Sequence, residues 1–112
     1  MVLVDVNGEE AEKMLATRKI VVADFWAEWC IPCRAVDDAL RRLSALIQNH
    51  DNISFIRINI DENPDFAAKH GVLNLPTVIV FYKGREYDRI SGNISGIEVK
   101  IYRLIKQLLN SP

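Results

Sequence analysis

Metal-binding and disulfide-stabilised classes of protein are poorly supported here, because the chain is short of cysteine and histidine. Its 112 residues contain two cysteines, Cys30 and Cys33, and two histidines, His50 and His70. The histidines fall on predicted elements away from the cysteines, so a four-ligand zinc or iron–sulfur site would need two chains. A chain of this length can bury a core without covalent cross-links, so it needs no disulfide in order to fold.

The sequence also lacks long apolar runs and regions of one charge. Its formal net charge is -1, and lysine and arginine are scattered among acidic residues, with no basic stripe for nucleic acid and no polybasic patch for a membrane. The longest apolar runs are about as long as a strand and could not span a bilayer. The first residues show neither the basic start nor the apolar stretch of a signal peptide. We therefore expect a cytoplasmic protein, with one domain over residues 1–112, that binds neither nucleic acid nor membrane.

Strand-like and helix-like segments alternate along the chain. Asn7 with Glu10, and Ser95 with Glu98, each predict the start of a helix through a capping box or related cap. Short β-branched and aromatic runs predict strands, and apolar residues at helical spacing predict amphipathic helices. The expected strands are 2–6, 20–26, 53–60, 75–82 and 85–90, and the expected helices start near residues 7, 32 and 95, with a short one over 61–70.

The resulting order, β-α-β-α-β-α-β-β-α, predicts an α/β fold. Strands that are joined through helices need parallel pairing, with helices on both faces of the sheet. The tight turn at Lys83-Gly84 adds an antiparallel hairpin. We expect a mixed central sheet of four to five strands, flanked by helices on both faces.

The two cysteines lie in the run Trp29-Cys30-Ile31-Pro32-Cys33, between a buried strand and a helix that begins near Pro32. Proline suits a first helical turn, and the free N–H groups of that turn favour a thiolate at Cys30. The pKa of Cys30 is therefore expected below the ~8.5 of a free cysteine. Cys33 lies one turn into the helix, where we expect it to be more buried and to keep its proton.

This asymmetry predicts dithiol–disulfide exchange. Cys30 would attack an external disulfide to form a mixed disulfide, and Cys33 would then attack Cys30 and release the reduced target. Taken alone, the close cysteine pair leaves three interpretations open: redox chemistry, metal binding, or two small buried hydrophobic residues. A permanent structural disulfide is not expected in the cytoplasm.

The segment around the cysteines resembles the active-site segment of the thioredoxin family, with isoleucine in place of the usual glycine. The resemblance covers nearly the whole chain, and the element order predicted above is that of the thioredoxin fold. The motifs that carry the resemblance are Asp24–Cys33, Asn59–Pro64, Leu75-Pro76-Thr77, Lys83-Gly84 and Gly92.

The resemblance implies roles for residues beyond the cysteines. Pro76 matches a cis-proline that faces the disulfide, an ordinary trans-proline being the alternative, and the backbone of Leu75 would pair with an extended target peptide. Asp24 is an acidic residue in an apolar strand and matches the acid–base group that takes the Cys33 proton, through water. Arg57 matches a position usually held by lysine, close to Asp24. The alternative is a structural Asp24–Arg57 ion pair with no kinetic role.

The same resemblance implies the surroundings of the reactive sulfur. Trp29 would flank the sulfur, and Trp26 would pack beneath the loop, with Asp61 accepting the Trp26 indole N–H. His70 is expected to be a cation at a helix end, and His50 a surface residue. The residues expected to form an apolar groove for extended substrates are Ile31, Pro32, Leu75, Pro76, Gly92 and Asn93.

Besides Arg57, four positions depart from the family pattern. Ile31 adds a bulky side chain at the target surface and leaves the reduction potential open. Asp38 replaces a helix-kinking proline, and the Asp37-Asp38 pair adds negative charge a turn beyond the thiols. Ser91 and Asn93 replace small apolar residues and make one wall of the groove more polar. These changes bear on which reductase and which targets recognise the protein more than on the redox chemistry.

The sequence therefore predicts a thiol–disulfide oxidoreductase that reduces protein disulfides as a monomer. It would need no bound cofactor or metal, since the electrons travel on the sulfurs of Cys30 and Cys33. Thioredoxin reductase or another dithiol donor would recycle it. A disulfide oxidase or isomerase, and a non-catalytic thioredoxin-like binding subunit, are the alternatives.

Overall fold

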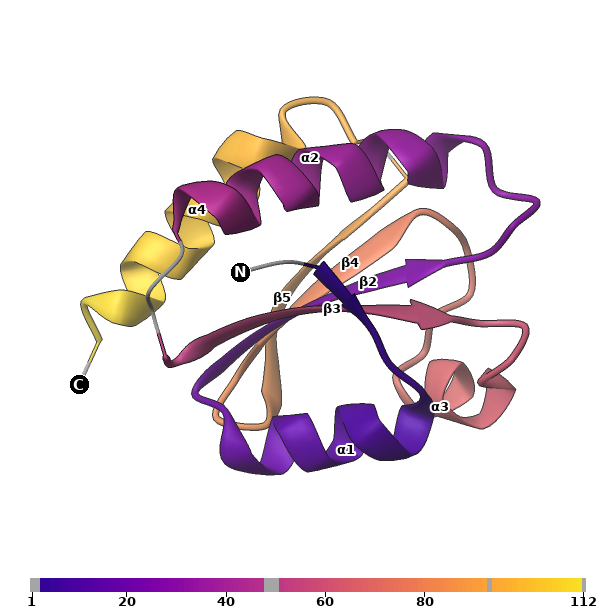
Figure 1. Cartoon of the computed structure of the whole chain (residues 1–112), viewed down its shortest axis with the longest axis horizontal. Helices are drawn as coiled ribbons and strands as arrows, with labels where there is room; N and C mark the ends of the chain where they lie inside the picture. The colour runs from indigo at the N-terminus through magenta and orange to yellow at the C-terminus, as the bar shows by residue number, and fades with distance from the viewer. Residues whose placement is uncertain (1–2, 48–50, 93, 112) are drawn as a thin grey trace.

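The helices and strands follow the predicted order along the chain. The computed structural model describes residues 3–47, 51–92 and 94–111. The elements are β1 (Leu3–Asp5), α1 (Gly8–Thr17), β2 (Ile20–Trp26), α2 (Pro32–Leu46), β3 (Ile53–Asn59), α3 (Pro64–Lys69), β4 (Thr77–Tyr82), β5 (Arg85–Ser91) and α4 (Ile97–Leu109). The five strands form one sheet in the spatial order β1-β3-β2-β4-β5 (Figure 1).

The sheet is mixed, as the sequence predicts. β1 and β2 both pair parallel with β3, whereas β4 runs antiparallel to β2 and to β5. β2 lies at the centre, and its residues from Ile20 to Phe25 are buried, which accounts for its nearly continuous apolar sequence. β5 lies at an edge and is largely exposed, in keeping with its polar sequence.

Helices cover both faces of the sheet (Figure 1). α2 and α4 pack on one face, where Val36 and Leu40 of α2 share a core with Val22 of β2 and Ile101 of α4. α1 and α3 cover the other face through a second core. The apolar stripe of α2 holds this helix across the sheet, and the short connection over residues 27–31 brings its first turn to the end of β2.

One predicted helix cap is confirmed and the other is wrong. Asn7 accepts a hydrogen bond from the Glu10 N–H at 2.8 Å, and the Glu10 side chain accepts from the Asn7 N–H, so α1 begins with a capping box. At α4 the N-cap is Gly96, in the left-handed region with a φ of 69°, and no side chain caps the helix. Glu98 instead accepts a hydrogen bond from Arg42 of α2 at 2.6 Å, because the two helices pack side by side.

Two predicted boundaries shift for local reasons. The predicted helix over 61–70 is α3, which begins only at Pro64. The side chain of Asn59 accepts hydrogen bonds from the N–H groups of Asp61 and Glu62, which stabilises a turn there. The predicted strand over 75–82 begins at Thr77, after Pro76. Among the described residues, no helix combines the length and the apolar composition that a membrane crossing requires.

Candidate active site

Cys30 and Cys33 lie where β2 gives way to α2, and they form a disulfide. Their Cα atoms are 5.4 Å apart, and both side chains are largely buried, with 5% of Cys30 and 2% of Cys33 exposed. Pro32 is the first residue of α2, and no side chain caps this helix end. The Cys33 N–H donates to the Cys30 carbonyl at 3.3 Å, so the first turn of α2 is closed by its own backbone. Cys30 lies two residues before the first residue of α2, at the positive end of the helix dipole.

The strand register brings several predicted site segments to the same end of the sheet. Trp26, the last residue of β2, lies opposite Asn59 of β3, and Phe25 lies opposite Thr77 of β4. The Leu75–Pro76 bond that precedes Thr77 is cis, as the resemblance implies. The Gly92 N–H donates to the Pro76 carbonyl at 3.0 Å, which joins the loops before β4 and after β5.

Two large apolar side chains beside the cysteines face solvent. Trp29 is 64% exposed and Ile31 is 67% exposed. The Trp29 indole N–H donates to the carboxylate of Asp61 at 2.9 Å. The predicted hydrogen bond from Trp26 to Asp61 is therefore wrong, since the Trp26 N–H is buried with no hydrogen-bond partner in the structure. Asp61 therefore positions Trp29 and not Trp26.

Arg57 pairs with carboxylates other than Asp24. Its guanidinium lies 4.0 Å from the centre of the Trp26 ring, a cation–π geometry. One guanidinium nitrogen lies 2.8 Å from Asp37 of α2, and another lies 3.0 Å from Asp5 of β1. Asp24 lies directly opposite Arg57 in the β2–β3 register, yet no Asp24–Arg57 ion pair forms, so the predicted alternative of a structural pair is wrong.

Asp24 is fully buried, and neither of its carboxyl oxygens has a hydrogen-bond donor in the structure. Burial raises the pKa of Asp24 well above 3.8, and the neighbouring carboxyl group of Asp37 raises this pKa further, because it favours the protonated form of Asp24. Attraction to Arg57 and Arg41 opposes these effects without cancelling them. Asp24 therefore holds a proton at a pH where an ordinary aspartate has lost it.

Asp37 is a further residue beside the cysteines, which the sequence analysis does not single out as a site residue. Its side chain turns inward toward Asp24 and Arg57 and is 14% exposed. The available signal was its spacing, because Asp37 follows Cys33 by four residues on a predicted helix and so lies on the same side of it. Its neighbour Asp38 is exposed.

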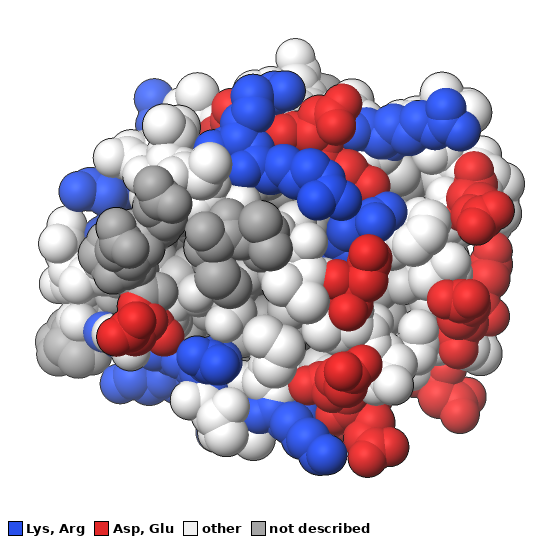
Figure 2. Space-filling view, in the orientation of Figure 1, with Lys and Arg blue, Asp and Glu red and all other residues white. Residues whose placement is uncertain are grey.

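A cavity of about 230 Å³ lies beside the cysteines. Its lining residues include both cysteines, Trp26, Arg57 and Asp37. Acidic side chains gather along the edge of the molecule to which the loops after β2 and β3 lead (Figures 1 and 2). Exposed acidic residues of these loops include Glu28, Asp61 and Glu62.

Comparison with known proteins decides the family. The Thioredoxin family model matches residues 2–106. Thioredoxin of Streptomyces clavuligerus is 40% identical over 79 residues, which cover 70% of this chain and 71% of that protein. The chain belongs to the thioredoxin family.

Other thioredoxins agree in sequence and in structure. The mitochondrial thioredoxin-2 of Schizosaccharomyces pombe is 42% identical over 78 residues, which cover 70% of this chain and 56% of that protein. The X-ray structure of Fasciola hepatica thioredoxin superposes with a TM-score of 0.76 at 30% identity, over 94% of this chain and 97% of that one. The predicted thioredoxin fold and family are confirmed. With its cysteine pair at the active-site position, the protein is a thiol–disulfide oxidoreductase with the dithiol–disulfide reductase chemistry of thioredoxins.

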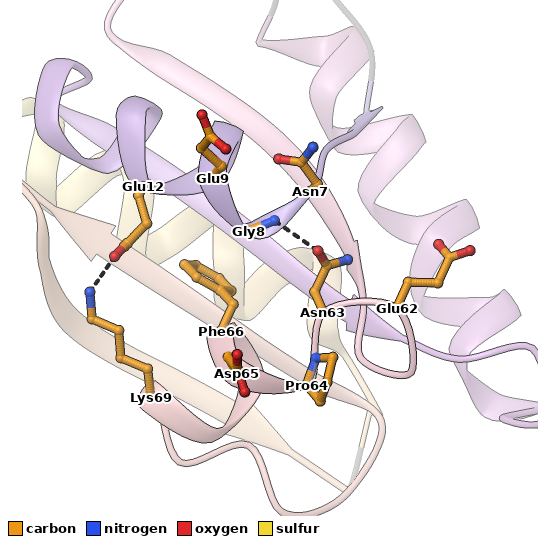
Figure 3. Close-up of a pocket in the computed structure, with 10 residues that line it drawn as sticks. All are labelled: Asn7, Gly8, Glu9, Glu12, Glu62, Asn63, Pro64, Asp65, Phe66 and Lys69. Carbon is orange, nitrogen blue, oxygen red and sulfur yellow. Dashed lines mark hydrogen bonds and ion pairs between the residues drawn. The ribbon is translucent and has the colours of Figure 1, made fainter.

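A second cavity, of about 480 Å³, contains none of the residues that the thioredoxin resemblance assigns to the site (Figure 3). It is a seam between the starts of α1 and α3, with Phe66 at its side. The Gly8 N–H donates to Asn63, and Lys69 pairs with Glu12, so these polar groups already have partners. We assign it to packing between the two helices.

Two further expectations have different outcomes. His70 is not a helix-end cation: burial lowers its pKa, and its ring packs 4.6 Å from that of Phe66 and 5.1 Å from that of Phe81. Asn93, the predicted polar wall of the groove, and His50 lie outside the described residues. Across residues 3–47, 51–92 and 94–111 there is no group of three or more His, Cys, Asp and Glu side chains that could hold a metal ion.

Proposed function

We propose that Cys30 is the attacking cysteine and Cys33 the resolving cysteine in the reduction of protein disulfides. The observation that carries this assignment is the position of Cys30, which lies two residues before the first residue of α2, whereas Cys33 lies inside that helix. The positive end of the helix dipole stabilises negative charge on the first sulfur.

The reaction then proceeds in two displacements. The Cys30 thiolate attacks a target disulfide, forms a mixed disulfide and releases one target sulfur as a thiolate. Cys33 loses its proton and attacks Cys30, so that the Cys30–Cys33 bond forms and the second target sulfur leaves with its electron pair. The target gains two electrons and the protein becomes oxidised, with no cofactor involved. We propose Asp24 as the group that takes the Cys33 proton through water, since its raised pKa suits proton exchange with a thiol.

The groove that we propose for the target surrounds this disulfide. Exposed Trp29 and Ile31 supply apolar contact area, and Asp61 fixes the indole of Trp29. The loop before β4 offers backbone groups next to the end of β2, where an extended target segment would add as a strand. The remaining groove residues in this proposal are Pro32, Leu75, Pro76 and Gly92, with Trp26 and Arg57 in support.

The thioredoxin family implies protein disulfides as substrates and a reductase as electron donor. We propose a monomer, one domain over residues 1–112, that works in the cytoplasm and is recycled by thioredoxin reductase or another dithiol donor. Bacterial thioredoxins among the relatives support this compartment, although a mitochondrial thioredoxin is also among them. Nucleic acid and membrane have no part in the proposal, and neither has a metal.

The test combines a trapped intermediate with a redox potential. Cys33→Ser should accumulate a mixed disulfide with an oxidised peptide, whereas Cys30→Ser should form none, as mass spectrometry would show. The equilibrium potential against a dithiol buffer should lie near the reducing end of a scale that runs from roughly -270 mV to about -120 mV. A potential near the oxidising end would indicate a disulfide oxidase or isomerase. Full biological activity of the doubly substituted Cys30→Ser/Cys33→Ser protein would indicate a non-catalytic binding subunit.

A further inference from the structure

Three strands and one helix bring four charged side chains to one place. Asp5 of β1, Arg57 of β3 and Asp24 of β2 lie in register across the sheet. α2 covers this face of the sheet, and Asp37 reaches down from it. Arg57 pairs with Asp37 at 2.8 Å and with Asp5 at 3.0 Å, while Asp5 is mostly exposed. The buried part of the cluster thus holds two carboxyl groups and one guanidinium.

When both are ionised, neither of the two carboxyl groups can donate a hydrogen bond to the other. Both oxygens of Asp24 and one oxygen of Asp37 are buried with no hydrogen-bond partner in the structure. The other oxygen of Asp37 is the one that pairs with Arg57. Two ionised carboxylates that touch repel each other and leave these oxygens unsatisfied. One proton between them removes the repulsion, because the O–H of Asp24 then donates to the free oxygen of Asp37.

Of the two carboxyl groups, Asp37 is the one that lines the cavity beside the thiols. Asp24 is 0% exposed and is absent from the lining of the cavity beside the cysteines. Asp37 lines that cavity together with Cys33, which precedes it by one turn of α2. At about 230 Å³ the cavity has room for several waters, and its lining includes charged side chains. A proton from Cys33 therefore reaches the pair through the cavity and Asp37.

We propose that Asp24 and Asp37 act as one carboxyl pair, which takes up the Cys33 proton as a proton shared between them. Asp37 is a positioning residue in this reaction, since it acts through Asp24 and through water in the cavity. This inference rests on the proposed role of Asp24 as the base and deepens it. In the step, the Cys33 S–H bond breaks, the proton passes through water to the ionised pair, and the Cys33 sulfur forms its bond to Cys30. The target thiolate leaves with the electron pair of the mixed disulfide. The shared proton later returns to solvent through the cavity.

The charged groups around Asp24 determine the direction of the expected effect. Asp37 and Arg41 face it from α2 and Arg57 faces it from β3, while Asp5 of β1 acts on it through Arg57; its neighbour on β4 is Val78, which carries no charge. Replacing Asp37 by asparagine removes one negative charge and the acceptor of the shared proton. The proton affinity of Asp24 should fall, because both changes favour its ionised form.

The experiment compares Asp37→Asn with Asp38→Asn in the full chain. Asp38 is the next residue on α2 and is exposed, so its substitution changes the net charge equally without touching the pair. Single-turnover reduction of a disulfide-containing peptide by the reduced protein, followed from about pH 5.5 to pH 9, separates mixed-disulfide formation from its resolution. Asp37→Asn should slow resolution at pH 7 by about tenfold or more and leave the first step within about twofold. Asp38→Asn should leave both steps within about twofold.

Side-chain carbon-13 NMR supplies a readout that does not depend on activity. In the unsubstituted protein, the Asp24 carboxyl carbon should show an inflection with pH, and the Asp37 carboxyl carbon should change its chemical shift at that same pH, because it accepts the Asp24 proton. In Asp37→Asn, the Asp24 inflection should move to lower pH by about one unit or more. If Asp37→Asn does not fold, the spectrum of the unsubstituted protein is the test. An Asp37 carboxyl carbon whose chemical shift does not follow the Asp24 inflection would overturn the shared proton.

The outcomes separate this inference from the proposed role of Asp24. If Asp24→Asn slows resolution while Asp37→Asn behaves like Asp38→Asn, the pair is wrong and Asp24 acts alone. If Asp24→Asn leaves resolution unchanged, the base role fails and the pair fails with it. If Asp37→Asn slows resolution without moving the Asp24 inflection, Asp37 acts by some means other than proton sharing, and the proposal is overturned.

Discussion

Asp24 is held in the core at a cost to stability. It is fully buried, without a hydrogen-bond donor, and its pKa is raised well above 3.8. Between pH 3.8 and that raised pKa, the folded protein binds more protons at this site than the unfolded chain. The free energy of unfolding therefore falls as pH rises through this interval, because ionisation is easier in the unfolded state.

Replacing Asp24 by asparagine should therefore stabilise the fold. The amide nitrogen can donate to the free oxygen of Asp37, and no buried charge forms at high pH. We expect the free energy of unfolding at pH 8 to rise by about 1–3 kcal/mol, the usual penalty of a buried unsatisfied polar group. Urea denaturation at pH 4 and at pH 8 measures this gain, which should be smaller at the lower pH. A gain that is equal at both pH values would show that ionisation of Asp24 is not its cause.

Positions that follow from local sequence could be predicted, and contacts between separate elements could not. The sequence places Asp24 in a strand and the cysteine pair at the start of a helix, as the structure confirms. The partners of Arg57 and the acceptor for Trp29 depend on which side chains approach across separate elements. No spacing in the sequence fixes such approaches, and the pairs predicted for Trp26 and Arg57 were wrong for that reason.

Among the helices and strands, α2 contributes most to the site, since it carries Cys33 and Asp37 on one side and the apolar stripe on the other. The pattern of apolar residues predicts well those helices and strands that are strongly buried, and β2 has the predicted range of 20–26. Boundaries set by loop geometry were less predictable. Gly96, with its positive φ, replaces the expected side-chain cap of α4, and the Asn59 turn delays α3. These features arise from single backbone angles and from hydrogen bonds between residues close in sequence, and the spacing of apolar residues does not predict either.

The contribution of the α1 capping box to stability can be tested by substitution. Asn7→Ala removes the acceptor for the Glu10 N–H and leaves the first turn of α1 without its side-chain cap. We expect the free energy of unfolding to fall by about 1 kcal/mol. Asn7→Asp is the matched control, because aspartate caps a helix as well as asparagine does. It should change the free energy of unfolding by a few tenths of a kcal/mol at most. Equal losses for both variants in chemical denaturation would mean that the cap does not stabilise the fold.

The His70 side chain packs between a helix and a strand, and its protonation affects the stability of the whole molecule at acidic pH. Its imidazole lies between Phe66 of α3 and Phe81 of β4, while Arg89 of β5 donates to its carbonyl oxygen at 2.6 Å. Burial lowers the pKa of His70 below 6.5, so between that lowered pKa and pH 6.5 the unfolded chain binds more protons at this site than the folded protein. The contribution of His70 to stability is present above pH 6.5 and is lost progressively as pH falls from 6.5 through the lowered pKa of the folded state.

We therefore expect His70→Gln to flatten the acid side of the stability curve. The unsubstituted protein should lose free energy of unfolding between pH 7 and pH 5, and the variant should lose less over the same interval. Proton NMR of the His70 ring should show an inflection below that of a histidine in a short peptide. A ring that titrates at or above the peptide value would contradict the lowered pKa, and parallel stability curves would show that other groups govern acid stability.

The central position of β2 has a consequence for how the chain is made. β2 spans residues 20–26, but its sheet neighbours β3 and β4 end only at residues 59 and 82. During synthesis the ribosome therefore releases a run of apolar residues well before either partner strand exists. Until then the nascent segment exposes two unpaired edges and two apolar faces, the features that favour aggregation. The order of strands that buries Asp24 thus leaves the same strand in need of protection, by a chaperone or by rapid elongation, while the chain is still attached.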